Sequence, residues 1–409
     1  MAVNKFDNSM FDAGTIGTTA NKLLQLDGST KIPAVDGSLL TGIPSSFTKN
    51  ASDPTISTNP SGGVGSLWAN TTSGEVYCCT DATAGANVWK NVGAGTGNIV
   101  PAAVYGGTTF GYYAGGVAAP GDSNRIEKWS FTSDGNSVDA TSDLLTAVHY
   151  TAGACSTTHG YTCSGKPSGP YTDQIQKWAF ASTANATDVG NSIVSGEGIS
   201  GHSSETHGYT SGVYQSNWPT GADTIQKWSF STDGNATDVG NLSGGNSYGP
   251  SSWSDFISSY GWAGSVGFIT GWTYKDNIEK FSYTSDGNSI DVCNMFSTRG
   301  NVTSCNSATH GYTAGGNKPA SYDNTIQKFS MASGTNGTDV GNLTVGKHNI
   351  AIPGASSTTY GYRAGGQISG NPRVDVIDKF SFSSDGNASD VGDLTEAKYW
   401  GANAHVVTG

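Results

Sequence analysis

Six lysines, one in each copy of a repeated I-x-K-[WF] motif, are each followed eleven residues later by an aspartate. A lysine and a carboxylate at a fixed separation can form an ion pair or exchange a proton in acid–base chemistry. A catalytic centre occurs once in a chain, whereas this pair recurs, so the spacing predicts a structural ion pair that enforces register. The pairs are Lys128/Asp139, Lys177/Asp188, Lys227/Asp238, Lys280/Asp291, Lys328/Asp339 and Lys379/Asp390.

The element that must position each pair is a β-hairpin. Within IQKWSF, period-2 alternation places Ile225, Lys227 and Ser229 on one face of a strand. The Asp-Gly at 233–234 supplies the positive φ angles of a two-residue hairpin loop. That loop would set Asp238 opposite Ser229 and diagonal to Lys227, so the lysine and the aspartate are expected to meet across the hairpin.

The hairpin belongs to an internal repeat of about fifty residues. Each unit has a G-[YW] strand and an I-x-K-[WF] strand, with further extended stretches upstream. Four antiparallel strands per unit, with Gly-Gly or Ser-Gly after the aromatic strand, resemble the kelch type of β-propeller blade. The resemblance implies an all-β chain with a six-bladed, kelch-like propeller of four-stranded blades over residues 99–409. A solenoid of stacked hairpins is the alternative that repetition leaves open. The copies begin at Ile126, Ile175, Ile225, Ile278, Ile326 and Ile377.

The end of the chain predicts how the ring closes. After the sixth repeat the sequence continues as EAKYWGANAHVVTG, which aligns with a first strand and then stops. An orphan strand needs an edge to pair with, and the first blade is the simplest partner. The segment IVPAAVYG, from Ile99, would compete for the same place.

Two segments precede the repeats. Residues 17–43, GTTANKLLQLDGSTKIPAVDGSLLTGI, are similar to a sequence found near the start of bacteriophage tail fibre and tailspike proteins. Residues 66–93 resemble a second short β module of the same proteins, in which Trp68, Tyr77 and Trp89 would form the small core.

The resemblance implies a virion component in three parts: a virion-attachment segment at 1–47, a small β module at 48–98 and the propeller at 99–409. In that family such segments join the fibre to the particle, frequently in homotrimers. The expected partners are other tail or virion proteins at the N-terminus and a bacterial surface glycan or protein at the propeller. The expected location is the virion tail, outside the cell.

Composition excludes several other classes of partner. The net charge is −12 and only four arginines are present, so the chain has no basic surface that could neutralise a phosphate backbone. No nucleic-acid binding is therefore expected. The N-terminus lacks the regions of a signal peptide, and no apolar run approaches the roughly 18 residues of a membrane helix. Neither membrane insertion nor secretion by the ordinary signal route is expected.

No metal or cofactor site is predicted. Cys163 and Cys293 stand where other repeats have small residues, so cysteine acts as an apolar filler. The spacing of Asp-Gly-Asn does not match a calcium loop. The arginines are scattered, unlike the cluster of a sialidase, and 26 Asp and 6 Glu single out no carboxylate pair for glycoside hydrolysis. An adhesin without enzymatic activity is therefore expected, with a polysaccharide-depolymerising tailspike and a purely structural tail component as alternatives.

The repeats differ most in the loop between strands two and three. Aromatic residues on variable loops over a rigid scaffold commonly form recognition surfaces. These loops should emerge on the same face as the connections between blades, which carry Tyr150, Trp253, Tyr399 and Trp400. The alternative is that the rings cap the edges of the core. The predicted receptor-binding residues are Tyr171, Tyr214, Trp218, Trp253, Phe268, Trp272, Tyr274 and Tyr322.

Overall fold

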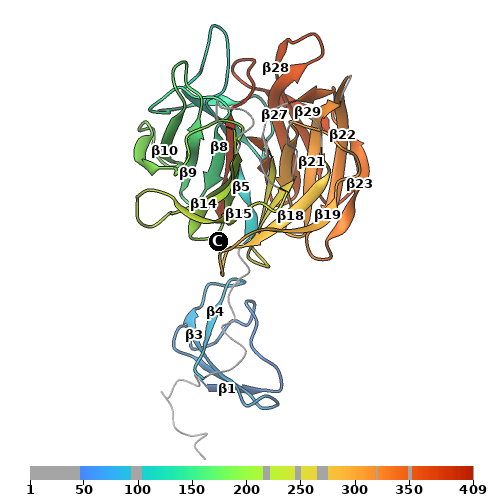
Figure 1. Ribbon diagram of the computed structural model, residues 1–409. Helices are drawn as coiled ribbons and strands as arrows, with labels where there is room; N and C mark the ends of the chain where they lie inside the picture. The colour runs from blue at the N-terminus through green and yellow to red at the C-terminus, as the bar shows by residue number, and fades with distance from the viewer. Residues whose placement is uncertain are drawn as a thin grey trace, which may run out of the picture. The chain divides into compact units, whose positions relative to one another are not determined.

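The computed structural model describes residues 47–93, 104–214, 222–244, 250–264, 275–318, 321–348 and 352–408. The chain divides into two compact units, Met1–Pro101 and Ala102–Gly409. The described residues form strands and no helix, so the all-β class is confirmed, and none of them forms a helix that could cross a membrane (Figure 1). Except for Phe47, the predicted virion-attachment segment lies outside the described residues.

The first unit is a four-stranded sheet with an aromatic core. Trp68, Tyr77, Cys79 and Trp89 are buried together, and the two indole rings lie 6.0 Å apart at 67°. The core expected from the sequence is therefore present. The strands pair in the order β1 (Phe47–Asn50), β2 (Leu67–Asn70), β3 (Val76–Asp81) and β4 (Val88–Asn91), with β1 parallel to β2 and the others antiparallel.

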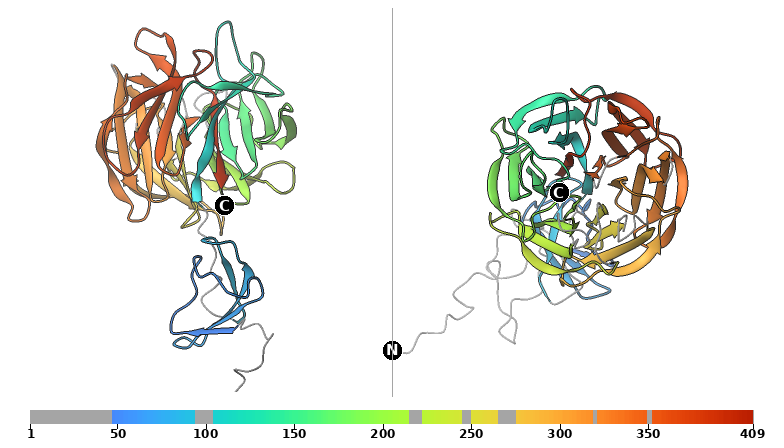
Figure 2. Two further views of the ribbon diagram at one scale, coloured as in Figure 1. Left: turned by 180° about the vertical axis from the view of Figure 1, so that it is seen from behind. Right: turned by 45° about the horizontal axis from the view of Figure 1, so that its top comes forward.

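The second unit is propeller-like: in its described part, six antiparallel sheets are arranged about a central axis (Figure 2). We number the sheets in chain order. Sheet 1 contains β30 (Ala402–Thr408), β5 (Val104–Ala114), β6 (Arg125–Ser130) and β7 (Val138–Asp143). Sheet 2 contains β8 (Ala152–Cys155), β9 (His159–Gly165), β10 (Thr172–Ala179) and β11 (Thr187–Asn191). Sheet 3 contains β12 (Ser200–Ser203), β13 (His207–Val213), β14 (Ala222–Ser229) and β15 (Thr237–Asn241).

The remaining three sheets repeat this order of strands. Sheet 4 contains β16 (Ser251–Asp255), β17 (Tyr260–Gly264), β18 (Asn277–Ser282) and β19 (Ile290–Asn294). Sheet 5 contains β20 (Thr303–Asn306), β21 (His310–Lys318), β22 (Ser321–Ser330) and β23 (Thr335–Asn342), with β25 (Ile352–Pro353) parallel to β20. Sheet 6 contains β26 (Ala355–Ser356), β27 (Tyr360–Ile368), β28 (Arg373–Ser381) and β29 (Ser389–Asp393), with β24 (Lys347–His348) also paired to β27.

The last strand joins the two ends of the second unit. β30 pairs antiparallel with β5, where Ala402 lies opposite Ala114 and Ala404 opposite Tyr112. The orphan segment at the end of the chain therefore completes the first sheet, as predicted. β26 of sheet 6 contacts both β5 and β30. Sheets 6 and 1 are thus neighbours, as in a ring and unlike an open stack.

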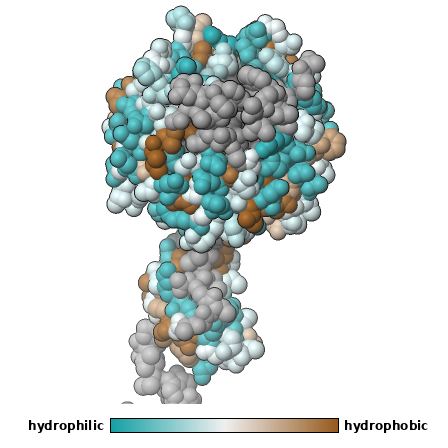
Figure 3. All heavy atoms as spheres, viewed as in Figure 1, coloured by the Kyte–Doolittle hydropathy of each residue, from teal (hydrophilic) through white to brown (hydrophobic). Residues whose placement is uncertain are grey.

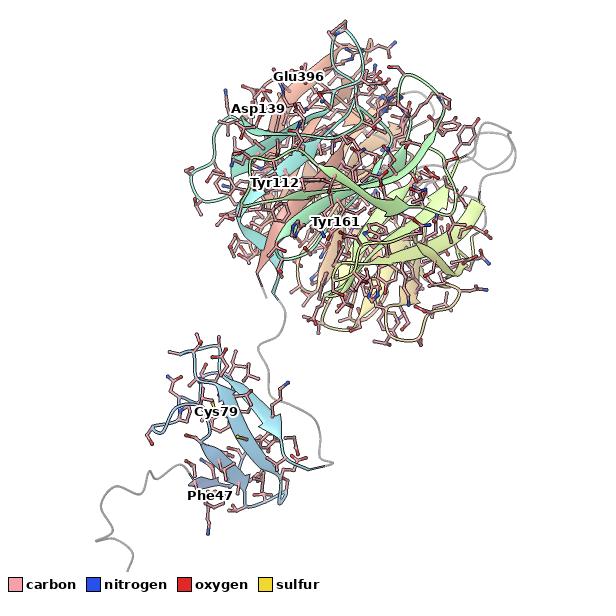
Figure 4. All side chains as sticks on the ribbon, turned by 90° about the vertical axis from the view of Figure 1, so that its left-hand side faces the viewer. Phe47, Cys79, Tyr112, Asp139, Tyr161 and Glu396 are labelled. Carbon is pink, nitrogen blue, oxygen red and sulfur yellow. The ribbon has the colours of Figure 1, made fainter. Side chains whose placement is uncertain are left out.

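The aromatic parts of the repeat hold the sheets against one another. Tyr161 of sheet 2 stacks on Phe230 of sheet 3 with the ring centroids 4.9 Å apart, and Tyr112 stacks on Phe180 at 4.7 Å. Both tyrosines lie among the strands (Figure 4). Glycine precedes each such residue because the strand-three ring crosses it: a Cβ at Gly160 would lie 2.2 Å from the Trp178 ring. Burying one such ring stabilises the fold by roughly 1.5–3 kcal/mol.

The predicted pairing of each lysine with its own aspartate is wrong. A register shift after Ile225 places Gln226 opposite Asp238 and Lys227 opposite Thr237. Asp238 instead accepts a hydrogen bond from the backbone N–H of Gly240, at 3.0 Å. The same shift sets Lys128, Lys177, Lys280, Lys328 and Lys379 beside Val138, Thr187, Ile290, Thr338 and Ser389, not beside Asp139, Asp188, Asp291, Asp339 and Asp390.

Four of the lysines bind the Asp-Gly turn of the next sheet. Lys227 Nζ lies 2.6 Å from Asp286 Oδ2, and the other pairs are Lys177/Asp233, Lys328/Asp385 and Lys379/Asp134. The turns of sheets 2 and 5 have no Asp-Gly, and Thr183 and Gly334 stand where the other turns have the aspartate. The lysines that face them, Lys128 and Lys280, lie over the rings of Phe110 and of Tyr260. The turn therefore joins neighbouring sheets, which is why it does not form the predicted tight hairpin.

Candidate binding surface

Connections between sheets are held in place by the variable residue of the I-x-K motif. Glu127 Oε2 accepts the N–H of Thr395 at 2.7 Å, and Gln176 Oε1 accepts the N–H of Thr146 at 3.0 Å. A buried acceptor here satisfies a backbone donor of the connection, so the position requires Gln, Glu or Asp. The other members are Gln226, Glu279, Gln327 and Asp378, which accept from Ile193, Ser243, Phe296 and Thr344.

A buried ion pair fixes the connection that leads into β30. Lys398 Nζ lies 2.6 Å from Glu127 Oε1, and both side chains are fully buried. Burial alone would raise the pKa of Glu127, but the charge of Lys398 and the hydrogen bonds from Lys398, Ser137 and Thr395 outweigh it and lower that pKa. The carboxylate is therefore ionised, and the ion pair anchors Lys398 two residues before Trp400.

Three successive connections are hydrogen-bonded side by side. The N–H of Tyr150 donates to the carbonyl of Trp400 at 2.8 Å, and the N–H of Gly198 donates to the carbonyl of Tyr150 at 3.2 Å. Isolated bridges also tie the connections to the ends of the second strands, His149 to Lys166 and Glu197 to Tyr214. Connections and strand-two loops therefore share one face, as the sequence predicted.

Tyr150 and Trp400 both have left-handed backbones. Their φ angles are 56° and 64°, and their rings stack with centroids 4.1 Å apart at 29°. Both side chains are half-buried. A bulky residue in this region of φ/ψ space costs about 1–3 kcal/mol, and such residues concentrate at binding and catalytic sites. The stacked pair is the centre of what we call the connection surface: Asp122, His149, Tyr150, Tyr399 and Trp400.

The rim of the connection surface is polar. His149 Nδ1 lies 2.8 Å from Asp122 Oδ1, and the Ser168 hydroxyl donates to Asp122 Oδ2 at 2.8 Å. The His149 ring lies against Trp400, with centroids 5.9 Å apart. Burial lowers the pKa of His149 in spite of the neighbouring Asp122. At neutral pH a neutral imidazole and a carboxylate therefore border the aromatic pair.

A second group adjoins the connection surface, and we call it the Glu197 group: Lys166, Tyr171, Glu197 and Tyr214. Glu197 is only 8% exposed, and its Oε2 atom has no hydrogen-bond partner among the described residues. Lys166 Nζ lies 4.8 Å from the centroid of the Tyr171 ring. Burial raises the pKa of Glu197, and the positive charge of Lys166 opposes that effect.

The predicted receptor-binding residues fall into four sets. Tyr171 and Tyr214 lie in the Glu197 group and are half-buried. Tyr322 lies in β22, outside both groups, where its ring packs against His348 with centroids 4.4 Å apart at an angle of 44°. Trp253 cannot belong to an exposed surface: it lies in the inner strand β16, is 1% exposed, and donates its indole N–H to the carbonyl of Tyr312 at 2.8 Å. Trp218, Phe268, Trp272 and Tyr274 lie outside the described residues.

Four polar residues of the connection surface and the Glu197 group were not singled out from the sequence: Asp122, His149, Lys166 and Glu197. Each is a lone polar residue in a connection or loop, so its type and spacing carry no signal. The rarity of glutamate is the one signal that could have marked Glu197, which is one of only 6 in the chain.

The surface combines flat aromatic faces with hydrogen-bonding carboxylates. That combination suits sugar rings, whose faces stack on aromatic side chains and whose hydroxyls donate to acceptors. The described residues contain no cluster of three or more His, Cys, Asp or Glu side chains placed to hold a metal ion. On the side of the molecule shown in Figure 3, the surface is mostly hydrophilic, with hydrophobic residues scattered among polar ones.

No protein-family model matches the chain, and no curated protein matches its sequence.

Proposed function

We propose that this chain is a bacteriophage tail fibre or related virion adhesin that recognises a bacterial surface glycan. Its second unit would be a six-bladed, kelch-like propeller carrying the connection surface. The segment at 1–47 would bind other tail proteins, in a homotrimer on the virion. The proposal draws on the resemblance of residues 17–43 and 66–93 to tail-fibre segments and on the six sheets of the described chain.

The observation that carries the binding role is the pair of aromatic residues with left-handed backbones. The ring of sheets does not require them there, because Gly198 and Asn301 hold the same place in other connections with φ angles of 65° and 57°. Glycine and asparagine suit that conformation, whereas Tyr150 and Trp400 do not. Two strained aromatics side by side favour a role beyond folding.

Binding of the full-length protein to host cells tests this proposal. Tyr150→Ala and Trp400→Ala should each weaken binding at least tenfold, because each removes a stacking face. Tyr322→Ala is the matched control, since Tyr322 is a half-buried aromatic on a distant sheet. Equal binding by all four proteins would refute the proposal. A sedimentation measurement of mass tests the trimer.

A depolymerising tailspike is a second candidate, favoured by one observation. Burial raises the pKa of Glu197, and a raised pKa is what a general acid of a glycosidase needs. Release of reducing ends from host envelope polysaccharide, abolished by Glu197→Gln, would establish that activity. A purely structural tail component would bind no host cells at all.

A further inference from the structure

The six repeats form two equivalent sets of three. The leading isoleucines Ile126, Ile175 and Ile225 recur as Ile278, Ile326 and Ile377 after 152, 151 and 152 residues. Glu127 and Glu279 each accept a hydrogen bond from a serine, Ser137 and Ser289 respectively. The two turns without Asp-Gly, at Thr183 and Gly334, also correspond. Sheets 1, 2 and 3 are therefore matched by sheets 4, 5 and 6, and residues of one set have counterparts in the other.

Because of this correspondence, the Glu197 group can be compared with its counterpart in the second set of sheets. Tyr171 and Tyr322 each lie four residues before the leading isoleucine, and Glu197 and His348 each lie 22 residues after it. Both connection residues are buried, at 8% and 6% exposed. A tyrosine beside a buried connection residue thus occurs twice, once with a carboxylate and once with an imidazole.

At the His348 position, nearly all hydrogen-bonding groups are paired within the protein. His348 Nε2 lies 2.8 Å from Gln367 Oε1, its ring packs against Tyr322 at an angle of 44°, and the Tyr322 hydroxyl donates to Asn371 Oδ1 at 3.4 Å. Burial lowers the pKa of His348 to about 4, so the ring is neutral at pH 7. Only the uncharged Nδ1 atom is left without a partner.

At the equivalent position, Glu197 lacks a hydrogen-bond donor that it needs more strongly. Its Oε2 atom is buried without a donor, and an unpaired buried carboxylate oxygen is far more costly than an unpaired neutral nitrogen. Lys166 does not supply this donor. Among the described ion pairs none joins Lys166 to Glu197, and the ammonium lies over Tyr171. The Glu197 oxygen therefore still lacks a hydrogen-bond donor, and Tyr171 is close by, since burial and the charge of Glu197 both raise the pKa of Tyr171.

We propose that Glu197 and Tyr171 form a subsite for an uncharged hexose residue of the receptor glycan. The sugar ring would stack on the face of Tyr171 opposite Lys166, and a sugar hydroxyl would donate to Glu197. A uronic or sialic acid is disfavoured by the buried carboxylate, and an ammonium-bearing sugar by Lys166. This inference rests on the proposed function and adds the class of sugar that the surface accepts.

An array of immobilised neutral, amino and uronic-acid oligosaccharides, probed with the full-length protein, tests the class. Neutral oligosaccharides should be retained, and binding confined to charged ones, or to none, would overturn the inference. Calorimetry with the best neutral oligosaccharide should then show at least a tenfold loss of affinity for Glu197→Gln and Tyr171→Ala. The matched variants His348→Gln and Tyr322→Ala should bind as the unaltered protein does.

Two further results separate this subsite from the proposed function. If Glu197→Gln and Tyr171→Ala bind normally while Trp400→Ala does not, the subsite is refuted and the adhesin proposal stands. If Trp400→Ala also leaves host-cell binding unchanged, the proposed function itself fails. Glu197→Gln should raise the melting temperature without ligand, because it removes an unpaired buried charge, and a large decrease would reveal an internal partner and overturn the subsite.

Discussion

The side-chain oxygen of Asn136 accepts a hydrogen bond from the backbone N–H of Asp393, 3.1 Å away and 257 residues later in the chain. The same bond joins every pair of neighbouring sheets in the second unit. Each asparagine belongs to the turn before strand four and reaches the outer strand of the preceding sheet. The other five are Asn185, Asn235, Asn288, Asn336 and Asn387, which bind Asp143, Asn191, Asn241, Asn294 and Asn342.

Removing this bond at the junction of sheets 6 and 1 should weaken the whole unit. Asn136→Ala is expected to lower the free energy of unfolding by about 1 kcal/mol, the usual net contribution of one hydrogen bond. Chemical denaturation of the full chain measures it. Ser133→Ala, in the same exposed turn, is the control and should change little. An unchanged midpoint for Asn136→Ala would show that the bond contributes nothing.

The lysine–turn pairs should depend on salt. Asp286→Ala removes the partner of Lys227, whose side chain is 25% exposed, and should cost about 0.5–1 kcal/mol at low ionic strength and less at 1 M salt. Lys280, which lies over Tyr260 instead, provides the comparison. Lys280→Met should show a weaker salt dependence than Asp286→Ala. Identical salt dependences would contradict the assignment of the two environments.

Backbone strain at Trp400 predicts an unusual order of stabilities. Trp400→Gly should be more stable than Trp400→Ala by about 1 kcal/mol, because glycine adopts a φ of 64° without strain and alanine does not. Both variants lose the ring and should lose binding alike. Thermal unfolding of the two proteins measures the difference. An alanine variant that equals or exceeds the glycine variant would argue against strain at this position.

Acid should destabilise the second unit through His202. Burial lowers the pKa of His202 to about 4, whereas the unfolded chain titrates near 6.5. Between those values the unfolded state binds more protons, so stability is complete above pH 6.5 and falls as pH falls towards 4, by about 3 kcal/mol in all. Unfolding measured from pH 7.5 to 4 should show a shallower decline for His202→Gln. A parallel decline would contradict the assignment.

The buried pair of Lys398 and Glu127 should tolerate joint replacement better than single replacement. Glu127→Ala leaves an uncompensated buried ammonium and should cost about 3–5 kcal/mol. Replacing both by methionine should cost less, because no charge is left buried. Denaturation of the single and double variants tests this. A double variant less stable than Glu127→Ala would show that the ion pair itself supplies net stability.

Much of the fold could be predicted because it is local and repeated. The I-x-K-[WF] spacing predicts strands, the recurrence predicts equivalent sheets, and the orphan end predicts the pairing of β30 with β5. The predicted register of Lys227 was wrong because each Asp-Gly turn forms its hydrogen bonds with the preceding sheet, and a single hairpin cannot show that.

The sequence by itself determined which residues are aromatic, which loops vary and where the strands recur, because those features follow from side-chain type and period. Only the tertiary structure decided that Trp253 is buried while Tyr150 and Trp400, 250 residues apart, stack on one another. The physical reason is that closing the ring brings the last connection beside the first. Distant residues become neighbours there through backbone hydrogen bonds between connections, for which no side-chain pattern codes.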